Sequence, residues 1–209
     1  MDSNPIAKLT ELFRHFPGLG PRQAKRFVYH LLAQDKSFQD QLIFQIANLK
    51  KMVLQCPDCY RFFAVNENHH DDIRCKICTD RTRDPKLFMI VEKDVDLEAI
   101  QKAGSYAGYF FVLGGNLPLL EKKNASPIRL TELKKALELK IKNGVKEIII
   151  ALSASTEGDH TADFLRHEIT PLLGESDIKI TILGRGLSTG SEIEYADAET
   201  IRNALSNRH

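Results

Sequence analysis

Cys56-Pro57-Asp58-Cys59, followed by Cys75-Lys76-Ile77-Cys78, is the stretch that decides how this chain is organised. Fifteen residues separate the two Cys-x-x-Cys pairs, and all four cysteines of the 209-residue chain lie in them. Paired turns at this spacing are typical of a tetrahedral zinc site. Four thiolates close the coordination shell and leave no position for a water or a substrate, so the pattern predicts one structural Zn²⁺ per chain and no catalytic metal there.

Two other interpretations of the cysteines are a pair of disulfides and four free thiols. Disulfides would suit a secreted protein, but residues 1–5 show no basic region followed by an apolar core, so we expect no signal peptide and a cytoplasmic location. A redox Cys-x-x-Cys pair normally stands alone, whereas this chain has two. His69 and His70 lie between the pairs, and we interpret them as solvated loop residues.

The overall composition, 43% hydrophobic and 27% charged, is that of a soluble globular protein. The apolar runs, such as 148–152, are far shorter than the roughly 20 residues that span a bilayer, so no membrane association is expected. The net charge of +1 does not by itself indicate a polyanionic partner. However, residues 1–55 carry eight Lys or Arg against four Asp or Glu, so any contact with nucleic acid is expected there.

The N-terminal segment predicts two helices, 4–16 and from Pro21 onward, joined by Pro17-Gly18-Leu19-Gly20-Pro21. Gly18 and Gly20 would let the backbone approach a phosphate, which the first amides of the second helix would face. Arg22, Lys25 and Arg26 add a basic edge. This stretch resembles the helix-hairpin-helix motif of DNA-binding proteins that do not read sequence. The alternative is an ordinary tight turn between helices.

A longer helix is predicted over 37–55, with its apolar residues (Leu42, Ile43, Ile46, Leu49, Val53 and Leu54) toward the core. Between the cysteine pairs, 62–65 suggests a short strand and 66–72 a turn. The polar run 79–85 would then link the cysteine module to the rest of the chain.

Beyond residue 85 the apolar pattern changes to strands alternating with helices. Strands are predicted over 87–91, 109–113, 147–152 and 178–183, and helices over 97–102, 129–143 and 160–173. The nearly continuous apolar content suits strands buried on both faces of a parallel sheet, so this part is predicted to be α/β. The tail from Gly184 is rich in glycine, then acidic, then helical over 199–205, and it has no P-loop motif.

Three acidic residues follow predicted strands: Glu92, Glu157 and Asp159. Because ligands bind at the carboxyl ends of parallel strands, these carboxylates could converge on a Mg²⁺ ion. The pattern is similar to the Toprim domain of topoisomerases and primases. The alternative is that they are solvated or cap a helix, and Asp159 is a credible N-cap.

The order of the modules resembles the RecR family of bacterial recombination mediators. Matching motifs run along most of the chain, namely residues 17–21, the four cysteines, Arg83-Asp84, Val91-Glu92, Tyr106-x-Gly108-Tyr109, 112–115, Glu157-Gly158-x-x-Thr161-Ala162 and the segment 190–197. The resemblance implies an α/β multi-module fold. Its parts are a helix-hairpin-helix module for DNA binding and dimerisation (1–54), a four-cysteine zinc finger (55–80), a Toprim-like domain (81–183) and a C-terminal Walker B-like assembly segment (184–209).

The resemblance also implies a function. Members of this family are DNA-repair factors without enzymatic activity that dimerise through the N-terminal region, form ring-like tetramers, and act with RecO and RecF to load RecA at single-strand gaps. By position, DNA contacts would fall on Arg22 and Arg26. Glu92, Glu157 and Asp159 would bind a partner protein. The alternative is a Mg²⁺-dependent nuclease or related phosphoryl-transfer enzyme that uses the same three acids.

Three positions depart from the usual family pattern. Phe111 stands where a histidine is common, Ile182 where an arginine is common, and Ser188 where a proline is common. We expect these residues on the surfaces of the Toprim-like domain and the tail, where they would affect the choice of partner more than the fold.

Overall fold

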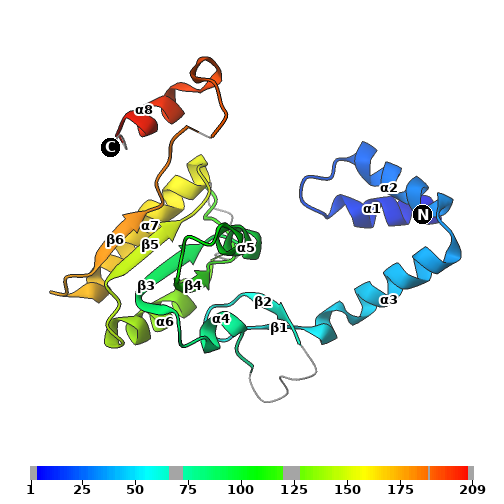
Figure 1. The fold of residues 1–209 in the computed structure, drawn as a ribbon. Helices are drawn as coiled ribbons and strands as arrows, with labels where there is room; N and C mark the ends of the chain where they lie inside the picture. The colour runs from blue at the N-terminus through cyan, green and yellow to red at the C-terminus, as the bar shows by residue number, and fades with distance from the viewer. Residues whose placement is uncertain (1–3, 66–72, 120–127, 188, 207–209) are drawn as a thin grey trace. The chain divides into compact units, whose positions relative to one another are not determined.

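The computed structural model describes residues 4–65, 73–119, 128–187 and 189–206 (Figure 1). The chain divides into two compact units, residues 1–53 and 54–209, and each is described by itself. His69, His70, Ser188 and the predicted turn at 66–72 lie outside the described residues.

The first unit contains the two predicted helices and the hairpin between them. Its described elements are α1 (Pro5–Arg14), α2 (Pro21–Ala33) and α3 (Lys36–Met52). The Asn4 side chain caps α1 by accepting a hydrogen bond from the Ile6 N–H at 3.0 Å. Helices α1 and α2 pack together through Phe13 and Phe27, whose ring centres are 6.1 Å apart.

The prediction for the third helix is wrong in two respects, namely where the helix ends and how far its apolar face is buried. It stops at Met52, and the next three residues form strand β1 (Val53–Gln55), which pairs with β2 (Phe62–Ala64). β-branched Val53 suits the extended backbone, and the pairing closes the first cysteine turn. The apolar residues of α3 remain largely exposed, with 64% of Ile43, 65% of Ile46 and 59% of Leu49 accessible to solvent.

A parallel sheet forms the centre of the second unit, as predicted. Its strands lie in the order β4-β3-β5-β6, and each neighbouring pair is parallel. They are β3 (Asp84–Val91), β4 (Gly108–Val112), β5 (Glu147–Ala151) and β6 (Lys179–Ile182). Val91 pairs with both Val112 and Ala151, so three strands end at the same edge. β3 begins within the run that we predicted to be a link.

Alternate residues of the central strands belong to two different cores, one on each face of the sheet. Phe88 and Ile90 pack with α6 (Leu130–Lys142) and α7 (Thr156–Leu173). Met89 and Val91 pack with Leu97 of α5 (Asp94–Ala103) and with the cysteines. The cysteine module, including α4 (Lys76–Thr79), therefore takes the place of a second helix on the α5 face.

Helix α7 begins four residues earlier than predicted, at Thr156. Its N-cap is Ser155, whose hydroxyl accepts a hydrogen bond from the Gly158 N–H at 3.1 Å. The interpretation of Asp159 as the N-cap is therefore wrong, because Asp159 already lies in the first turn. Acidic residues are favoured there by the helix dipole, which explains why the pattern was ambiguous.

The tail after β6 contains a short 3₁₀ helix, η1 (Ile193–Tyr195), and then α8 (Ala198–Ser206). In the segments that the structure describes, no helix is both long enough and apolar enough to cross a membrane.

Candidate metal centre and nucleic-acid interface

The four cysteines meet at one point, as their spacing predicted. Their sulfur atoms all lie within 4.8 Å of one another, and within the described ranges no other group of three or more His, Cys, Asp or Glu side chains meets this condition. Cys56, Cys59 and Cys75 are buried, Cys78 is partly exposed, and all four are free. Such a set can hold a metal ion with a closed shell of thiolates.

Local hydrogen bonds build each cysteine turn. In the first turn the Tyr60 N–H donates to the Cys56 carbonyl at 2.9 Å, and Tyr60 adopts a left-handed backbone with φ of 61°. In the second, the Cys78 N–H donates to the Cys75 carbonyl at 3.0 Å as α4 begins. The thiols are close enough to share protons: the hydrogen bond between Cys56 and Cys59 lowers the pKa of Cys56 and raises that of Cys59. A metal ion would replace these shared protons.

The cysteine module is joined to the sheet at edge strand β4. The Val112 N–H donates to the Cys59 carbonyl at 2.8 Å, and the Phe62 N–H donates to Asp94 Oδ1 at 2.7 Å. Because β4 is an edge strand, the bond from Val112 satisfies a backbone donor that would otherwise be left open. The module is thus a continuation of the α/β domain.

Phe111 lies in the core and not on the surface, which corrects our expectation for this position. It is 0% exposed, and its ring centre lies 5.3 Å from that of Tyr60 and 6.5 Å from that of Phe88. The aromatic side chain therefore packs the first cysteine turn against the sheet. Ile182 is exposed, as expected, whereas Ser188 is outside the described residues.

The hairpin between α1 and α2 has the geometry that the glycines predicted. Gly18 has a φ of 78°, in the left-handed region, and the Leu19 N–H donates to the Phe16 carbonyl at 3.2 Å. Gly20 is the N-cap of α2 and has no side chain that could cover the first amides of the helix. The N-terminus of α2 is thus open to an anion.

Arg22, Lys25 and Arg26 form an exposed basic edge on α2, beside the hairpin. No acidic residue occurs in α2, whose sequence is PRQAKRFVYHLLA. Lys25 lies over the Tyr29 ring at 5.9 Å, and Arg26 contacts Gln23 at 3.5 Å. These residues present positive charge and N–H donors on one surface, which suits contact with a phosphate backbone.

The first strand-end acid, Glu92, is buried, with 6% of its surface exposed. Its carboxylate contacts Lys93 Nζ at 2.5 Å and accepts a hydrogen bond from the Asn116 amide at 2.8 Å. Burial raises its pKa, but the contacts with Lys93, Ser153 and Asn116 outweigh burial and hold the pKa below its usual value. Asn116 was missed by our sequence analysis, although its position just after β4 could have indicated it.

Glu157 and Asp159 lie in the first turn of α7, at the same edge of the sheet. Glu157 is exposed, and Asp159 forms an ion pair with Arg185 of the tail. The structure does not bring these acids and Glu92 into a cluster as tight as that of the cysteines. Two of the three carboxylates instead neutralise basic side chains.

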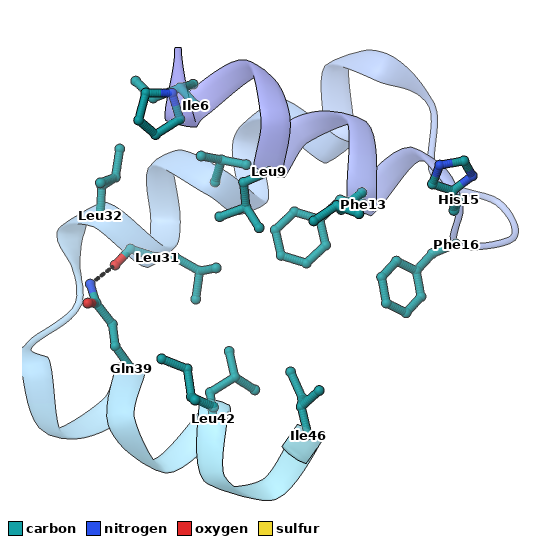
Figure 2. Close-up of a pocket in the computed structure, with 14 residues that line it drawn as sticks. Ile6, Leu9, Phe13, His15, Phe16, Leu31, Leu32, Gln39, Leu42 and Ile46 are labelled. Carbon is teal, nitrogen blue, oxygen red and sulfur yellow. Dashed lines mark hydrogen bonds between the residues drawn. The ribbon is translucent and has the colours of Figure 1, made fainter. Parts of the chain in front are cut away.

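An apolar groove of about 1010 Å³ opens between the helices of the first unit (Figure 2). Leu9 and Phe13 of α1, Leu31 of α2, and Leu42 and Ile46 of α3 point toward it. One wall is held by a hydrogen bond from the Gln39 amide to the Leu31 carbonyl at 2.7 Å. An exposed apolar surface of this kind is a candidate site for contact with another molecule.

Comparison with known proteins finds matches along the chain. The family model described as "RecR, helix-hairpin-helix" matches residues 6–49. The model described as "Toprim domain" matches residues 86–184, and the model described as "RecR, C-terminal" matches residues 186–209. The recombination protein RecR of Endomicrobium trichonymphae is 37% identical over 204 residues, which cover 98% of this chain and 96% of that protein. RecR of Herpetosiphon aurantiacus is 33% identical, and the match covers 98% of this chain and 93% of that protein. RecR of Legionella pneumophila (strain Corby) is 32% identical, and the match covers 97% of this chain and 96% of that protein.

Proposed function

This chain belongs to the RecR family of recombination proteins, and from that premise we propose that it is a DNA-binding subunit of a recombinational repair assembly. The observation that carries the proposal is the basic edge of α2 beside a hairpin whose helix N-terminus is open. DNA would be bound through its phosphates, without sequence preference. Acting with RecO and RecF, the protein would load RecA at single-strand gaps in the cytoplasm, on the nucleoid.

Charge reversal tests the DNA-binding proposal. Arg22→Glu with Arg26→Glu should weaken binding to a gapped duplex and lower the slope of log affinity against log salt by about 2, since each lost phosphate contact removes roughly 0.9. The matched control is Lys50→Glu with Lys51→Glu on α3, which makes the same change in net charge. Fluorescence anisotropy at several salt concentrations measures both. Equal loss in the two variants would show that only net charge matters and would contradict the assignment.

We propose that the metal held by the cysteines is zinc in a structural role. Four cysteine sulfurs within 4.8 Å of one another favour Zn²⁺, and a closed shell of four thiolates would exclude substrate. Structural zinc contributes on the order of 10 kcal/mol to the folding of small modules. Cys56→Ser should therefore unfold the module, seen as rapid proteolysis between residues 55 and 80. A well-folded variant without metal would contradict this role.

We propose that the apolar groove of the first unit is covered by a second copy of the chain, in a dimer or a ring-like tetramer. The support is the exposed apolar row on α3 together with the dimerisation that family resemblance implies for this region. Ile46→Asp should lower the mass seen in analytical ultracentrifugation. The control Leu139→Asp changes a residue of the second unit that is also exposed, at 61%, and should leave the mass unchanged. An unchanged mass for Ile46→Asp would contradict the proposal.

We propose that Glu92, Glu157 and Asp159 serve contact with a partner protein and do not catalyse cleavage. The ion pairs of Glu92 with Lys93 and of Asp159 with Arg185 support the second part of this proposal, because carboxylates that are already neutralised by a cation are less available to a catalytic metal ion. The alternative, a Mg²⁺-dependent nuclease, predicts cleavage of labelled gapped DNA by the pure protein with Mg²⁺. Cleavage that Glu92→Gln abolishes would overturn our proposal.

A further inference from the structure

The basic edge of α2 continues into an exposed aromatic residue. Together they stand at the spacing i, i+3, i+4 and i+7, which places side chains on one side of a helix, and they are Arg22, Lys25, Arg26 and Tyr29. All four are exposed. Tyr29 therefore ends the basic edge, about 10 Å along the helix axis from Arg22.

Tyr29 does not belong to the apolar side of the helix. That side carries Ala24 and Val28, which are buried, and Leu31, which lines the apolar groove of the first unit together with Val28. Tyr29 is not among the residues that line the groove, and 51% of its surface is exposed. The packing of the first unit thus leaves the ring available for contact with another molecule.

The ring lies among positive charges. Lys25, one helical turn before it, places its Nζ 5.9 Å from the ring centre, where an ammonium is attracted by the electron-rich face of the ring. Arg26 lies three positions before Tyr29, and its guanidinium donates to the Gln23 side-chain oxygen at 3.5 Å. No acidic residue occurs in α2. The surface around Tyr29 therefore combines a flat apolar ring with groups that bind phosphate.

A single strand of nucleic acid matches both parts of this surface. Its phosphates suit lysine and arginine, and the face of any base can stack on an aromatic side chain, so such stacking does not depend on sequence. In a duplex each base is already stacked between its neighbours, and separating a base step costs free energy. An aromatic ring within a basic edge therefore favours a strand whose bases are unpaired.

We propose that Tyr29 stacks on an unpaired base and gives the basic edge of α2 a preference for single-stranded over duplex DNA. This inference rests on the DNA-binding role proposed above and adds a specificity-determining residue to it. Lys25 and Arg26 bind the phosphates next to the stacked base. A gap differs from intact duplex in its unpaired bases, so Tyr29 directs the protein to the gap.

The first test compares the affinities of the full-length protein for three labelled probes at one salt concentration. The probes are a short oligothymidylate, a duplex of the same length, and a single strand of that length in which abasic residues replace every nucleotide. Loss of one base–aromatic stack corresponds to about 5- to 150-fold in affinity, so Tyr29→Leu should weaken binding to oligothymidylate by a factor in this range. Its affinities for the duplex and the abasic strand should stay nearly those of wild type.

Two variants separate the ring from general effects on the first unit. Tyr29→Phe keeps the ring and should bind all three probes nearly as wild type does. Phe44→Leu changes another aromatic side chain of the same unit, 59% exposed on α3 and outside the basic edge, and should also leave the three affinities unchanged.

A fluorescence measurement detects the stacking directly. The chain contains no tryptophan, so Tyr29→Trp introduces a single indole at this position. Stacking on a base should quench its emission when oligothymidylate binds, whereas the abasic strand, added to saturation, should leave the emission nearly unchanged. Equal quenching by the two strands, or none by either, would overturn the proposal.

The outcomes distinguish this inference from the DNA-binding role. Full binding of all three probes by Arg22→Glu with Arg26→Glu would contradict the basic edge as the DNA interface, and the role of Tyr29 with it. Loss of binding in that variant, together with wild-type affinity of Tyr29→Leu for oligothymidylate, would overturn the role of Tyr29 alone. An equal loss on all three probes in Tyr29→Leu would also overturn it, because the side chain would then support the fold or contact the backbone.

Discussion

The contact between Tyr60 and Phe111 should couple the stability of the first cysteine turn to that of the sheet. Phe111 is fully buried, and truncation of a buried phenylalanine to alanine lowers the free energy of unfolding by about 3–5 kcal/mol. The two rings are 5.3 Å apart with an interplanar angle of 50°, an arrangement in which aromatic pairs contribute about 0.5–1.5 kcal/mol beyond their burial. We therefore expect a coupling energy of about 1 kcal/mol between the two positions.

A double-mutant cycle measures this coupling. Phe111→Ala, Tyr60→Ala and the double variant are unfolded in urea with excess zinc present, and the transition is followed by far-ultraviolet circular dichroism, because the chain contains no tryptophan. The control cycle pairs Phe111→Ala with Tyr195→Ala, since Tyr195 is 80% exposed. That pair should be additive within about 0.3–0.5 kcal/mol. If the Tyr60 cycle is equally additive, the rings do not join the cysteine turn to the sheet, and our reasoning is wrong.

Two further predictions concern the acidic edge of the sheet. A Cβ at Gly158 would lie 1.9 Å from the Ser153 carbonyl oxygen, so Gly158→Ala should lower the free energy of unfolding by about 3 kcal/mol. The control Gly184→Ala should change the free energy of unfolding little, because no atom lies within 4 Å of the added carbon. Urea titrations measure both variants. Because the folded-state pKa of Glu92 is below its usual value, the stability that its ionised carboxylate contributes is fully present above the unfolded pKa of about 4.3 and is lost as the pH falls through the folded pKa. Glu92→Gln should thus be less stable than wild type at neutral pH, and the difference should shrink in acid; a difference that stays constant down to about pH 3 would contradict this assignment.

Much of the metal centre could be predicted from the sequence because the relevant signals are local. A Cys-x-x-Cys turn requires only a few neighbouring residues, so Cys56 and Cys75 could each be assigned without knowledge of the fold. The parallel strands were equally clear, since continuous apolar runs such as 148–152 are typical of strands that are covered on both faces, as this sheet is. The boundaries of α3 and α7 were harder, because Val53 and Thr156 are compatible with more than one backbone state.

Spacing along the chain was sufficient to identify the residues of the cysteine cluster, the segments that form the sheet and the position of the basic edge of α2, because each depends on a pattern within one element or turn. The tertiary structure was needed to show that Phe111 is buried against Tyr60, that Asp159 pairs with Arg185, and that Lys140 lies over the Tyr109 ring. It also left Ile43 and Ile46 exposed, although their periodicity is that of a core face. These features join residues that are far apart in the chain or depend on what covers a helix, and neither spacing nor periodicity carries that information.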